Sequence, residues 1–288
     1  MRQPVFSRSL RLLTACLIFV SALLGVSPLQ AQTVPPSKAA TLHLSQAQLN
    51  EDGSYWGILD ITLNKQVKTY WRTPGEAGLP PRFDWTGSVN LADVSLSWPV
   101  PIRFEDGGGH SIGYENSLTL PILFKPVDPR KAITIDLTLD YAVCDRLCLP
   151  MHERLRAVFD PNKGVPQAQQ IALQKALLRV PKKQSLDSAD APAVVRVISE
   201  GEMVRIDTRS ETTLAISDVF VEGPDGWVFS SPLPVSPAID GKHSFLVRVL
   251  ERPQRGDSLA NLTVAVTVVA PNAASETVLT LDKQGRAP

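Results

Sequence analysis

Apolar and polar residues alternate over most of the stretch from Thr41 to Phe159, which is the pattern of half-buried β-strands. The clearest runs are Ser117–Phe124 and Ala132–Leu139, in which every second residue is apolar. About seven short strands separated by turns within about 120 residues are typical of an immunoglobulin-like β-sandwich. The other expected strands are Leu42–Leu44, Trp56–Leu63, Lys68–Arg72, Arg82–Trp85 and Val94–Trp98.

The alternation stops after Phe159 and returns at Val194. Between them, Gln167–Val180 has the composition of a helix, which we expect to end before Pro181 because proline cannot continue a helical hydrogen-bond pattern. The region from Val194 onward is expected to form a second β-sandwich without chemistry of its own. Its expected strands are Val194–Ile198, Met203–Thr208, Leu214–Val221, Trp227–Phe229, Ser244–Val249, Leu262–Val269 and Thr277–Leu281.

The sequence therefore predicts an all-β protein, with an immunoglobulin-like β-sandwich followed by a second β-sandwich and one linker helix. We expect a signal segment over residues 1–31, the first sandwich over 32–160, the linker over 161–193 and the second sandwich over 194–288. The 24 prolines and 17 glycines agree with short strands and many turns.

The first 31 residues have the features of a secretory signal. Arg2, Arg8 and Arg11 precede an apolar run over Leu12–Val26, and the small residue Ala31 offers a cleavage point. An uncleaved anchor is the alternative, but the run has about 15 residues and a membrane span needs roughly 20. We expect cleavage near Ala31, export to the periplasm and no membrane span in the mature chain.

Leu13–Cys16 resembles a lipoprotein cleavage box, which would make Cys16 a lipid anchor. Most of the apolar run follows Cys16, whereas a lipoprotein signal would place it before the cysteine. We therefore expect Cys16 to be lost with the signal.

The formal charge of the chain is zero, and removal of three arginines without any acid leaves about −3. A nucleic-acid-binding surface normally shows a basic stripe. We expect no nucleic-acid partner.

Cys144 and Cys148 are the two cysteines expected in the mature chain, with three residues between them. The run Leu137–Val143 enters the pair as a strand, and Glu153–Phe159 leaves it as another. A tight hairpin and a single helical turn would each bring the two Cα atoms to about 5–6 Å, within disulfide range. A reversible disulfide is therefore plausible in either geometry.

Such a pair can be a structural staple or a disulfide that exchanges with other thiols. As a staple, a ring this small would contribute only about 2 kcal/mol, against roughly 4 kcal/mol for a loop of about fifty residues. A chain long enough to bury a real core has little need of it. A small, exposed ring is the kind of disulfide that exchanges with other thiols. Spacing alone leaves both interpretations open.

A metal site is a further alternative. On a helix, Cys144, Cys148 and His152 would lie on one face, with His110 as a possible fourth donor, and such ligands suit Cu(I) or Zn. Pro150 and the flanking strand patterns oppose a continuous helix there.

Three separated blocks resemble the periplasmic amino-terminal domain of the DsbD and ScsB family of transmembrane thiol reductants. They are Tyr70–Gly75, Arg103–Ile122 and Tyr141–Pro150, and the resemblance covers roughly residues 40–160. It implies an immunoglobulin-like domain that takes electrons from a membrane-embedded partner and passes them to periplasmic thioredoxin-like proteins through mixed disulfides. The membrane and thioredoxin-like domains of that family are missing here, so a separate membrane thiol reductant is expected to supply the electrons; the alternative is that the protein no longer receives them. No organic cofactor is expected.

The resemblance also implies roles for individual residues. Cys148 is expected to attack and to form the mixed disulfide, and Cys144 to resolve it. Glu105 and Asp106 match an acidic pair in a loop over the sulfurs, where carboxylates would disfavour a thiolate. Their alternative is to be solvated turn residues.

Trp71 matches an aromatic position near the site, with simple core packing as its alternative, and Tyr141 opens the cysteine block and is expected to help shape the site. Two departures are visible. Gly107–Gly109 stands where the best-known members carry an aromatic cap, and the cysteine spacing is shorter. The alternative function is a Cu(I)- or Zn-handling or non-catalytic binding β-protein with a structural disulfide.

Overall fold

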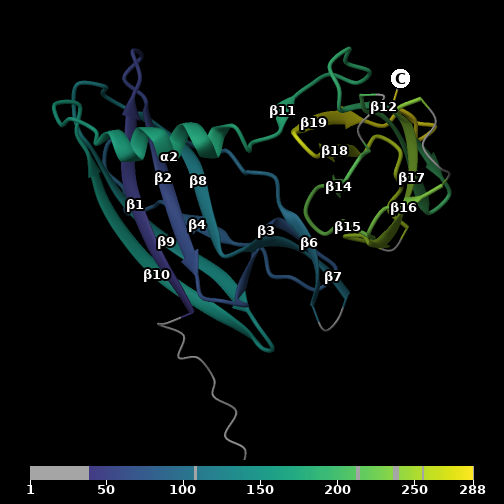
Figure 1. Ribbon diagram of the computed structural model, residues 1–288, viewed down its shortest axis with the longest axis horizontal. Coiled ribbons are helices and arrows are strands. Elements are labelled where there is room, and N and C mark those ends of the chain that lie inside the picture. The colour runs from purple at the N-terminus through teal and green to yellow at the C-terminus, as the bar shows by residue number, and fades with distance from the viewer. Residues whose placement is uncertain (1–38, 107–108, 212–214, 236–239, 255, 288) are drawn as a thin grey trace, which may run out of the picture. The chain divides into compact units, whose positions relative to one another are not determined.

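The computed structural model describes residues 39–106, 109–211, 215–235, 240–254 and 256–287. These residues belong to one compact unit, Val34–Pro288, which is built mainly from four β-sheets (Figure 1). The expected signal over residues 1–31, with Cys16, lies outside the described residues, as do Gly107 and Gly108.

The first two sheets form a β-sandwich. One sheet has the order β1–β2–β8–β5, and the other has the order β10–β9–β3–β7–β6, with β4 paired to β9. All of these pairings are antiparallel. The strands are β1 (Ala40–Leu49), β2 (Tyr55–Leu63), β3 (Lys68–Gly75), β4 (Arg82–Asp84), β5 (Leu91–Leu96), β6 (Ile102–Asp106), β7 (Gly109–Glu115), β8 (Ser117–Pro126), β9 (Ile133–Cys144) and β10 (Cys148–Phe159).

The core of this first sandwich comes from the alternating strands that the sequence marks most clearly. In β8 and β9, the side chains of Leu120, Phe124, Ile135 and Leu137 have no exposed surface. Burying a side chain of this size stabilises the folded state by about 1.5–3 kcal/mol. Phe124 also packs edge-on against Phe159, the last residue of β10, with ring centroids 5.3 Å apart. These contacts tie the two sheets together.

The predicted helix is present as α2 (Gln167–Leu177), three residues shorter than expected. Its end tightens, because the amides of Arg179 and Val180 bond to carbonyls only three residues earlier. α2 lies across β1, β2 and β8 (Figure 1), with Leu173 fully buried against Ala47 and Ile58.

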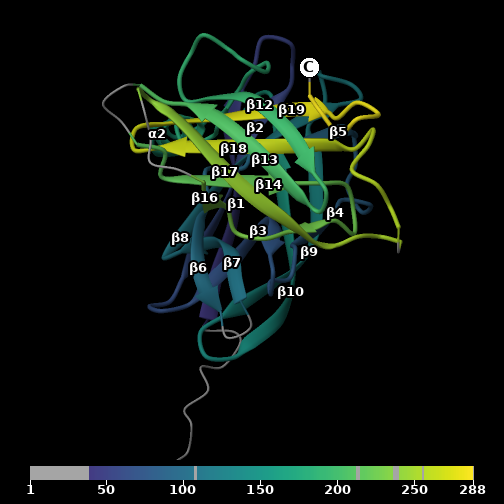
Figure 2. The ribbon, with the colours of Figure 1, turned by 90° about the vertical axis from the view of Figure 1, so that its right-hand side faces the viewer.

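The second sandwich also has two sheets, with the orders β11–β19–β18–β14 and β12–β13–β17–β15, and β16 is paired to β17. Figure 2 shows β12, β13 and β17 crossing in front of β18 and β19. The strands are β11 (Lys182–Lys183), β12 (Ala193–Glu200), β13 (Met203–Arg209), β14 (Asp218–Glu222), β15 (Val228–Phe229), β16 (Leu233–Pro234), β17 (Lys242–Glu251), β18 (Thr263–Ala270) and β19 (Ala273–Thr280).

The all-β prediction with two sandwiches and a linker helix is confirmed. Two details differ. β11 lies in the expected linker and pairs in parallel with β19. The residues Ile102–Glu115, which the alternation did not mark clearly, form the β6–β7 hairpin, so Glu105 and Asp106 belong to a strand rather than a loop. Within the described ranges, no helix is long and apolar enough to cross a membrane.

Replacing Leu120 with Ala should test whether the β8 core holds the first sandwich together. Leu120 has no exposed surface, so the change leaves a cavity and is expected to lower the free energy of unfolding by roughly 3 kcal/mol. Val158→Ala, at a side chain that is 59% exposed, is the control and should change it by less than about 0.5 kcal/mol. Denaturant unfolding measures both, and equal losses would contradict the assignment of the core.

Candidate functional site

The β9–β10 hairpin brings the two cysteines together. Cys144 ends β9 and Cys148 begins β10, and the two residues lie directly opposite each other in the ladder. Their sulfurs form a disulfide, and their Cα atoms are 4.1 Å apart, closer than the sequence-based value of about 5–6 Å. The pair therefore sits in a hairpin and not in a helical turn.

The two sulfurs differ in exposure. Cys144 is 2% exposed, whereas Cys148 is exposed, and the loop residue Leu147 between them is 64% exposed. Side chains alternate along β9, so Cys144 and Ala142 lie on the outer face of the sheet, in a small cluster with Tyr70 and Phe104. Cys148 is the sulfur that an incoming protein can reach.

Tyr70 of β3 lies over the disulfide. Its hydroxyl oxygen is 2.7 Å from Sγ of Cys144 and 3.1 Å from Sγ of Cys148. The register of β3 fixes this position: Oγ1 of Thr69 donates to the carbonyl of Ala142 at 2.9 Å. On the other side of β3, Gly113 lies opposite Tyr70, and a Cβ there would be 1.9 Å from the Thr69 carbonyl oxygen. Only glycine allows β7 to approach so closely.

Asp106, the last residue of β6, is the fourth residue in contact at this site, after Cys144, Cys148 and Tyr70. Its Oδ2 accepts a hydrogen bond from the Tyr70 hydroxyl at 2.5 Å. The two carboxylate oxygens lie 3.9 and 4.0 Å from Sγ of Cys148. The Phe104 ring stacks on the Tyr70 ring with centroids 6.2 Å apart, which orients the phenol.

The Tyr70 phenol has one proton to share among three neighbours. The disulfide sulfurs carry no proton and accept weakly, so the proton points to the carboxylate of Asp106. Burial raises the pKa of Tyr70 well above its usual value of about 10, and the hydrogen bond and charge of Asp106 raise it further. The phenol therefore stays protonated and remains a hydrogen-bond donor to whichever neighbour carries most negative charge.

The other residues expected to shape the site lie elsewhere. Glu105 is exposed, and alternation along β6 turns it to the face opposite Asp106. Tyr141 is 5% exposed and packs in the main core of the first sandwich, on the opposite face of β9 from Cys144. Trp71 belongs to the same core and packs against Phe220 of the second sandwich.

The histidines considered as metal ligands do not gather at the sulfurs. His152 lies four residues along β10 from Cys148, which is roughly 13 Å on an extended strand, and its Nδ1 is 2.6 Å from Oδ1 of Asp140. The helical face that would unite the set is not formed. Among the described residues, the donor group that does form is Asp106, Cys144 and Cys148, with ligand atoms within 4.8 Å of one another.

Tyr70 is the candidate site residue that the sequence pattern does not single out. The block Tyr70–Gly75 carries the resemblance, but the aromatic position that the resemblance indicates is Trp71. Strand alternation carries a usable signal, because neighbouring residues of a strand face opposite sides and only one of the two rings can face the sulfurs. Pattern alone does not say which.

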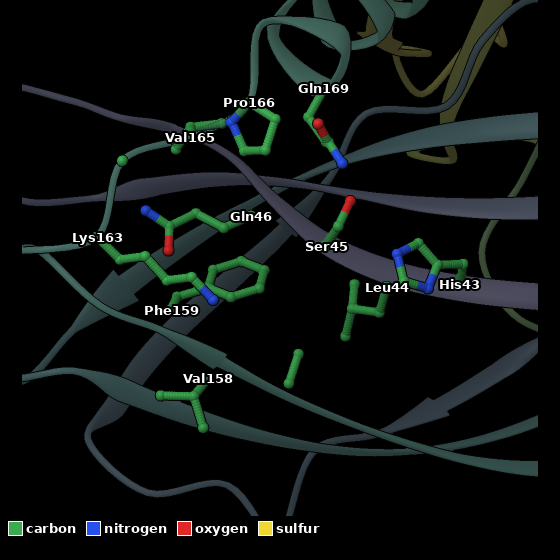
Figure 3. A pocket seen from close by; sticks show the side chains of 12 residues that line it. His43, Leu44, Ser45, Gln46, Val158, Phe159, Lys163, Val165, Pro166 and Gln169 are labelled. Atoms are coloured by element: carbon green, nitrogen blue, oxygen red, sulfur yellow. The ribbon is translucent and has the colours of Figure 1, made fainter.

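The cavity of about 270 Å³ shown in Figure 3 is not part of this site. It is bordered by β1, the end of β10 and the start of α2, and Figure 3 shows Ser45 and Gln169 pointing toward one another there. Phe159 and Cys148 lie at opposite ends of β10, roughly 35 Å apart at the usual rise of a strand.

These features define the class of the protein: an immunoglobulin-like β-protein that presents a disulfide at the tip of a hairpin. Residues 30–160 match the family described as "Thiol:disulfide interchange protein DsbD, N-terminal". This part of the chain therefore belongs to the amino-terminal domains of the DsbD family and is a thiol:disulfide interchange domain.

Two solved structures resemble the chain. The N-terminal periplasmic domain of ScsB from Proteus mirabilis is 22% identical, with a TM-score of 0.70, over 87% of this chain and 96% of that one. The N-terminal domain of Neisseria meningitidis DsbD in the reduced form is 14% identical, with a TM-score of 0.31, over 44% of this chain and 90% of that one. The first likeness shows that the fold of both sandwiches is shared. No curated protein sequence matches the chain.

The tyrosines provide a pH test of this arrangement. All four tyrosines of the chain have a raised pKa, in each case mainly because of burial. At a pH of about 10, where free tyrosine is half ionised, we expect the folded protein to show little phenolate absorbance and the denatured protein to show much more. The denatured chain ionises first, so the free energy of unfolding should fall as the pH rises above about 10. Denaturant unfolding monitored across this range checks both expectations.

Asp106→Asn isolates the contribution of the carboxylate. Without its charge, the pKa of Tyr70 should move down toward the value that burial alone sets, and the other tyrosines should titrate as before. Spectrophotometric titration measures this, and Tyr70→Phe identifies which part of the signal belongs to Tyr70. An unchanged titration in Asp106→Asn would show that the two groups do not interact.

Proposed function

We propose that this protein is a periplasmic thiol–disulfide exchange protein that carries electron pairs between a membrane thiol reductant and thioredoxin-like proteins. The observation that carries the proposal is the asymmetry of the disulfide. The Cys148 sulfur is exposed at the tip of the hairpin, while the Cys144 sulfur is buried beneath Tyr70. Such a pair has one sulfur for attack and one for resolution.

Reduction proceeds in two exchanges. A thiolate of the reduced donor attacks Sγ of Cys148, so the donor–Cys148 bond forms, the Cys144–Cys148 bond breaks and its electron pair goes to the Cys144 sulfur. The second thiolate of the donor then attacks the first donor sulfur, the one bonded to Cys148 in the mixed disulfide. This closes the disulfide of the donor and releases Cys148 as a thiolate. Two electrons have passed to this protein, and the reverse sequence passes them to an acceptor disulfide.

Tyr70 assists the step in which Cys144 leaves. As negative charge develops on that sulfur, the phenol proton turns from Asp106 to the sulfur 2.7 Å away. Because the pKa of Tyr70 is raised, the proton stays on the phenol and stabilises the sulfur by a hydrogen bond, an interaction worth about 1.5–3 kcal/mol with a charged group.

Asp106 has the opposite effect on Cys148. Its carboxylate lies within 4.0 Å of that sulfur and disfavours a thiolate there. A partner that displaces or screens the carboxylate removes this effect. The carboxylate therefore limits exchange with unspecific disulfides.

Features of the surface and of the relatives support the choice of partners. The exposed Leu147 beside Cys148 offers an apolar contact to a protein that docks on the hairpin tip. The matched ScsB domain is described as periplasmic, and the matched family as thiol:disulfide interchange proteins.

A soft metal ion is the second candidate ligand of this site. The grouping of Asp106 with the two sulfurs supports it, since thiolates favour Cu(I) and Zn. Binding would require the reduced form, so adding Zn²⁺ to reduced and to oxidised protein in a calorimeter tests it. Heat of binding that is absent from a Cys144→Ser/Cys148→Ser double variant would support a metal role.

The reduction potential of the Cys144–Cys148 pair tests the exchange function directly. Equilibration with defined ratios of reduced and oxidised glutathione should give a value between about −250 and −180 mV, the range of exchange-active proteins. A value below about −300 mV would mark a structural disulfide and refute the proposal.

Single cysteine variants test the division of roles. Cys144→Ser retains the exposed sulfur and should form a stable mixed disulfide with oxidised glutathione. Cys148→Ser retains the sulfur that is 2% exposed and should react roughly tenfold or more slowly. Mass spectrometry monitors both reactions. Under denaturing conditions the two variants should react equally, and equal rates in the folded state would refute the assignment.

A further inference from the structure

Two strands that carry the site residues also reach the second sandwich. β3 places Tyr70 over the sulfurs and continues directly into Trp71 and Arg72. β6 carries Arg103 three residues before Asp106. The same backbone segments therefore hold the group that touches the disulfide and the groups that touch β14 and β19.

β3 bulges immediately after Tyr70. Tyr70 pairs with Gly113 of β7, and the next paired residues are Gly75 and Ser111. This is five steps along β3 against two along β7, so β3 contains three extra residues. A bulge leaves its extra residues without ladder partners on the neighbouring strand. The position of the strand after Tyr70 must be set by other contacts.

The second sandwich supplies those contacts. Arg72 donates through Nε and Nη2 to both carboxylate oxygens of Glu222, at 2.8 and 2.6 Å, and also to Oε2 of Glu276. Oγ1 of Thr73 donates to Glu222 at 2.6 Å. Beside them, the Trp71 ring packs on Phe220 with centroids 5.6 Å apart. A bidentate arginine–carboxylate pair fixes orientation as well as distance.

β6 is tethered in the same way. Arg103 donates through Nε and Nη2 to the two carboxylate oxygens of Asp218, both at 3.1 Å, and through Nη2 to the carbonyl of Val219 at 3.1 Å. Its guanidinium also lies 5.0 Å from the centre of the Phe220 ring. The side chains of Arg103 and Asp218 are 17% and 22% exposed, so the pair is partly shielded from water.

A third tether reaches the β6–β7 hairpin. The amide of Glu76 donates to the carbonyl of His110 at 2.9 Å, and its Oε1 accepts from the amide of Ser231 at 3.3 Å. Next to these contacts, a cavity of about 570 Å³ borders Arg103, Asp218 and Phe220. The two sandwiches are therefore not closely packed beside Arg103 and Asp218, and the polar tethers bridge them at the border of this cavity.

From these contacts we propose that the second sandwich holds Tyr70 and Asp106 over the disulfide. In this role Glu222 and Asp218 are positioning residues that act through Arg72 and Arg103. The proposal rests on the exchange function proposed above and gives the second sandwich a part in it. Among the residues that the structure describes, no group of the second sandwich contacts the sulfurs, and it acts by fixing the two strands whose side chains do.

Glu222→Gln is the main test. Glu222 is 8% exposed, and its carboxylate accepts two hydrogen bonds from Arg72 and one from Thr73. The amide nitrogen of Gln cannot accept, so one Arg72 donor faces another donor and the bulge shifts. We expect dithiothreitol to reduce the disulfide about tenfold more slowly, the order expected for losing one hydrogen bond to a charged sulfur. The pKa of Tyr70 should also fall as the phenol moves away from Asp106.

Asp207→Asn is the matched control. Asp207 is a second-sandwich carboxylate, 17% exposed, whose partners Arg196 and Ser244 belong to the same sandwich. This variant loses an ion pair of the same kind without touching β3 or β6. It should be reduced at the rate of the unmodified protein and leave the Tyr70 titration unchanged. Asp218→Asn should behave like Glu222→Gln.

The outcomes separate the two proposals. A folded Glu222→Gln protein with an unchanged reduction rate and an unchanged Tyr70 titration overturns the positioning role. If Glu222→Gln does not fold, Arg72→Lys provides the same test. Lysine retains the positive charge but cannot make the bidentate pair with Glu222, so the reduction rate and the Tyr70 titration should change in the same direction. If the potential of the unmodified protein marks a structural disulfide, the exchange function fails, while the Tyr70 titration still decides whether the second sandwich positions the phenol.

Discussion

The site depends on one hydroxyl group. The oxygen of Tyr70 contacts the sulfurs of Cys144 and Cys148 and the carboxylate of Asp106, and these groups come from different strands. The contact can exist only if β3, β6 and the β9–β10 hairpin keep their register to within a fraction of an ångström. The rest of the first sandwich is arranged so that this is the case, from the Thr69–Ala142 hydrogen bond to the glycine at position 113.

In the proposed mechanism, one phenol proton serves two negatively charged groups. In the disulfide state the acceptor is Asp106, and in the mechanism proposed above the Cys144 thiolate takes its place. The carboxylate and the thiolate are therefore alternatives for the same donor, and the chemistry at Cys144 is coupled to the charge near Cys148. This gives a physical reason for combining a buried phenol, a buried sulfur and an exposed sulfur in so small a volume.

Local pattern in the sequence is enough to predict most of the strands and the position of the cysteine pair. Alternation marks most strands of both sandwiches but not the β6–β7 hairpin or β11, the cysteine spacing indicates a closable ring, and the resemblance indicates an acidic pair beside it. The pattern did not distinguish Asp106 from Glu105, or Tyr70 from Trp71, because these choices depend on the face that each residue takes in a strand whose register is set by distant partners. The contact of Trp71 with Phe220 joins residues far apart in the chain, and neither local periodicity nor composition contains that information.

β10 begins at the exposed sulfur and forms the edge of its sheet. An unpaired edge strand invites another chain to add to the sheet, and an exposed cysteine sulfur lies at the end of this one. Pro150 lacks an amide proton, and the exposed His152, Arg154 and Arg156 carry polar or charged groups along the edge. Two copies of this protein are therefore discouraged from aligning edge to edge, and the exposed Cys148 sulfur stays accessible at the tip of the hairpin.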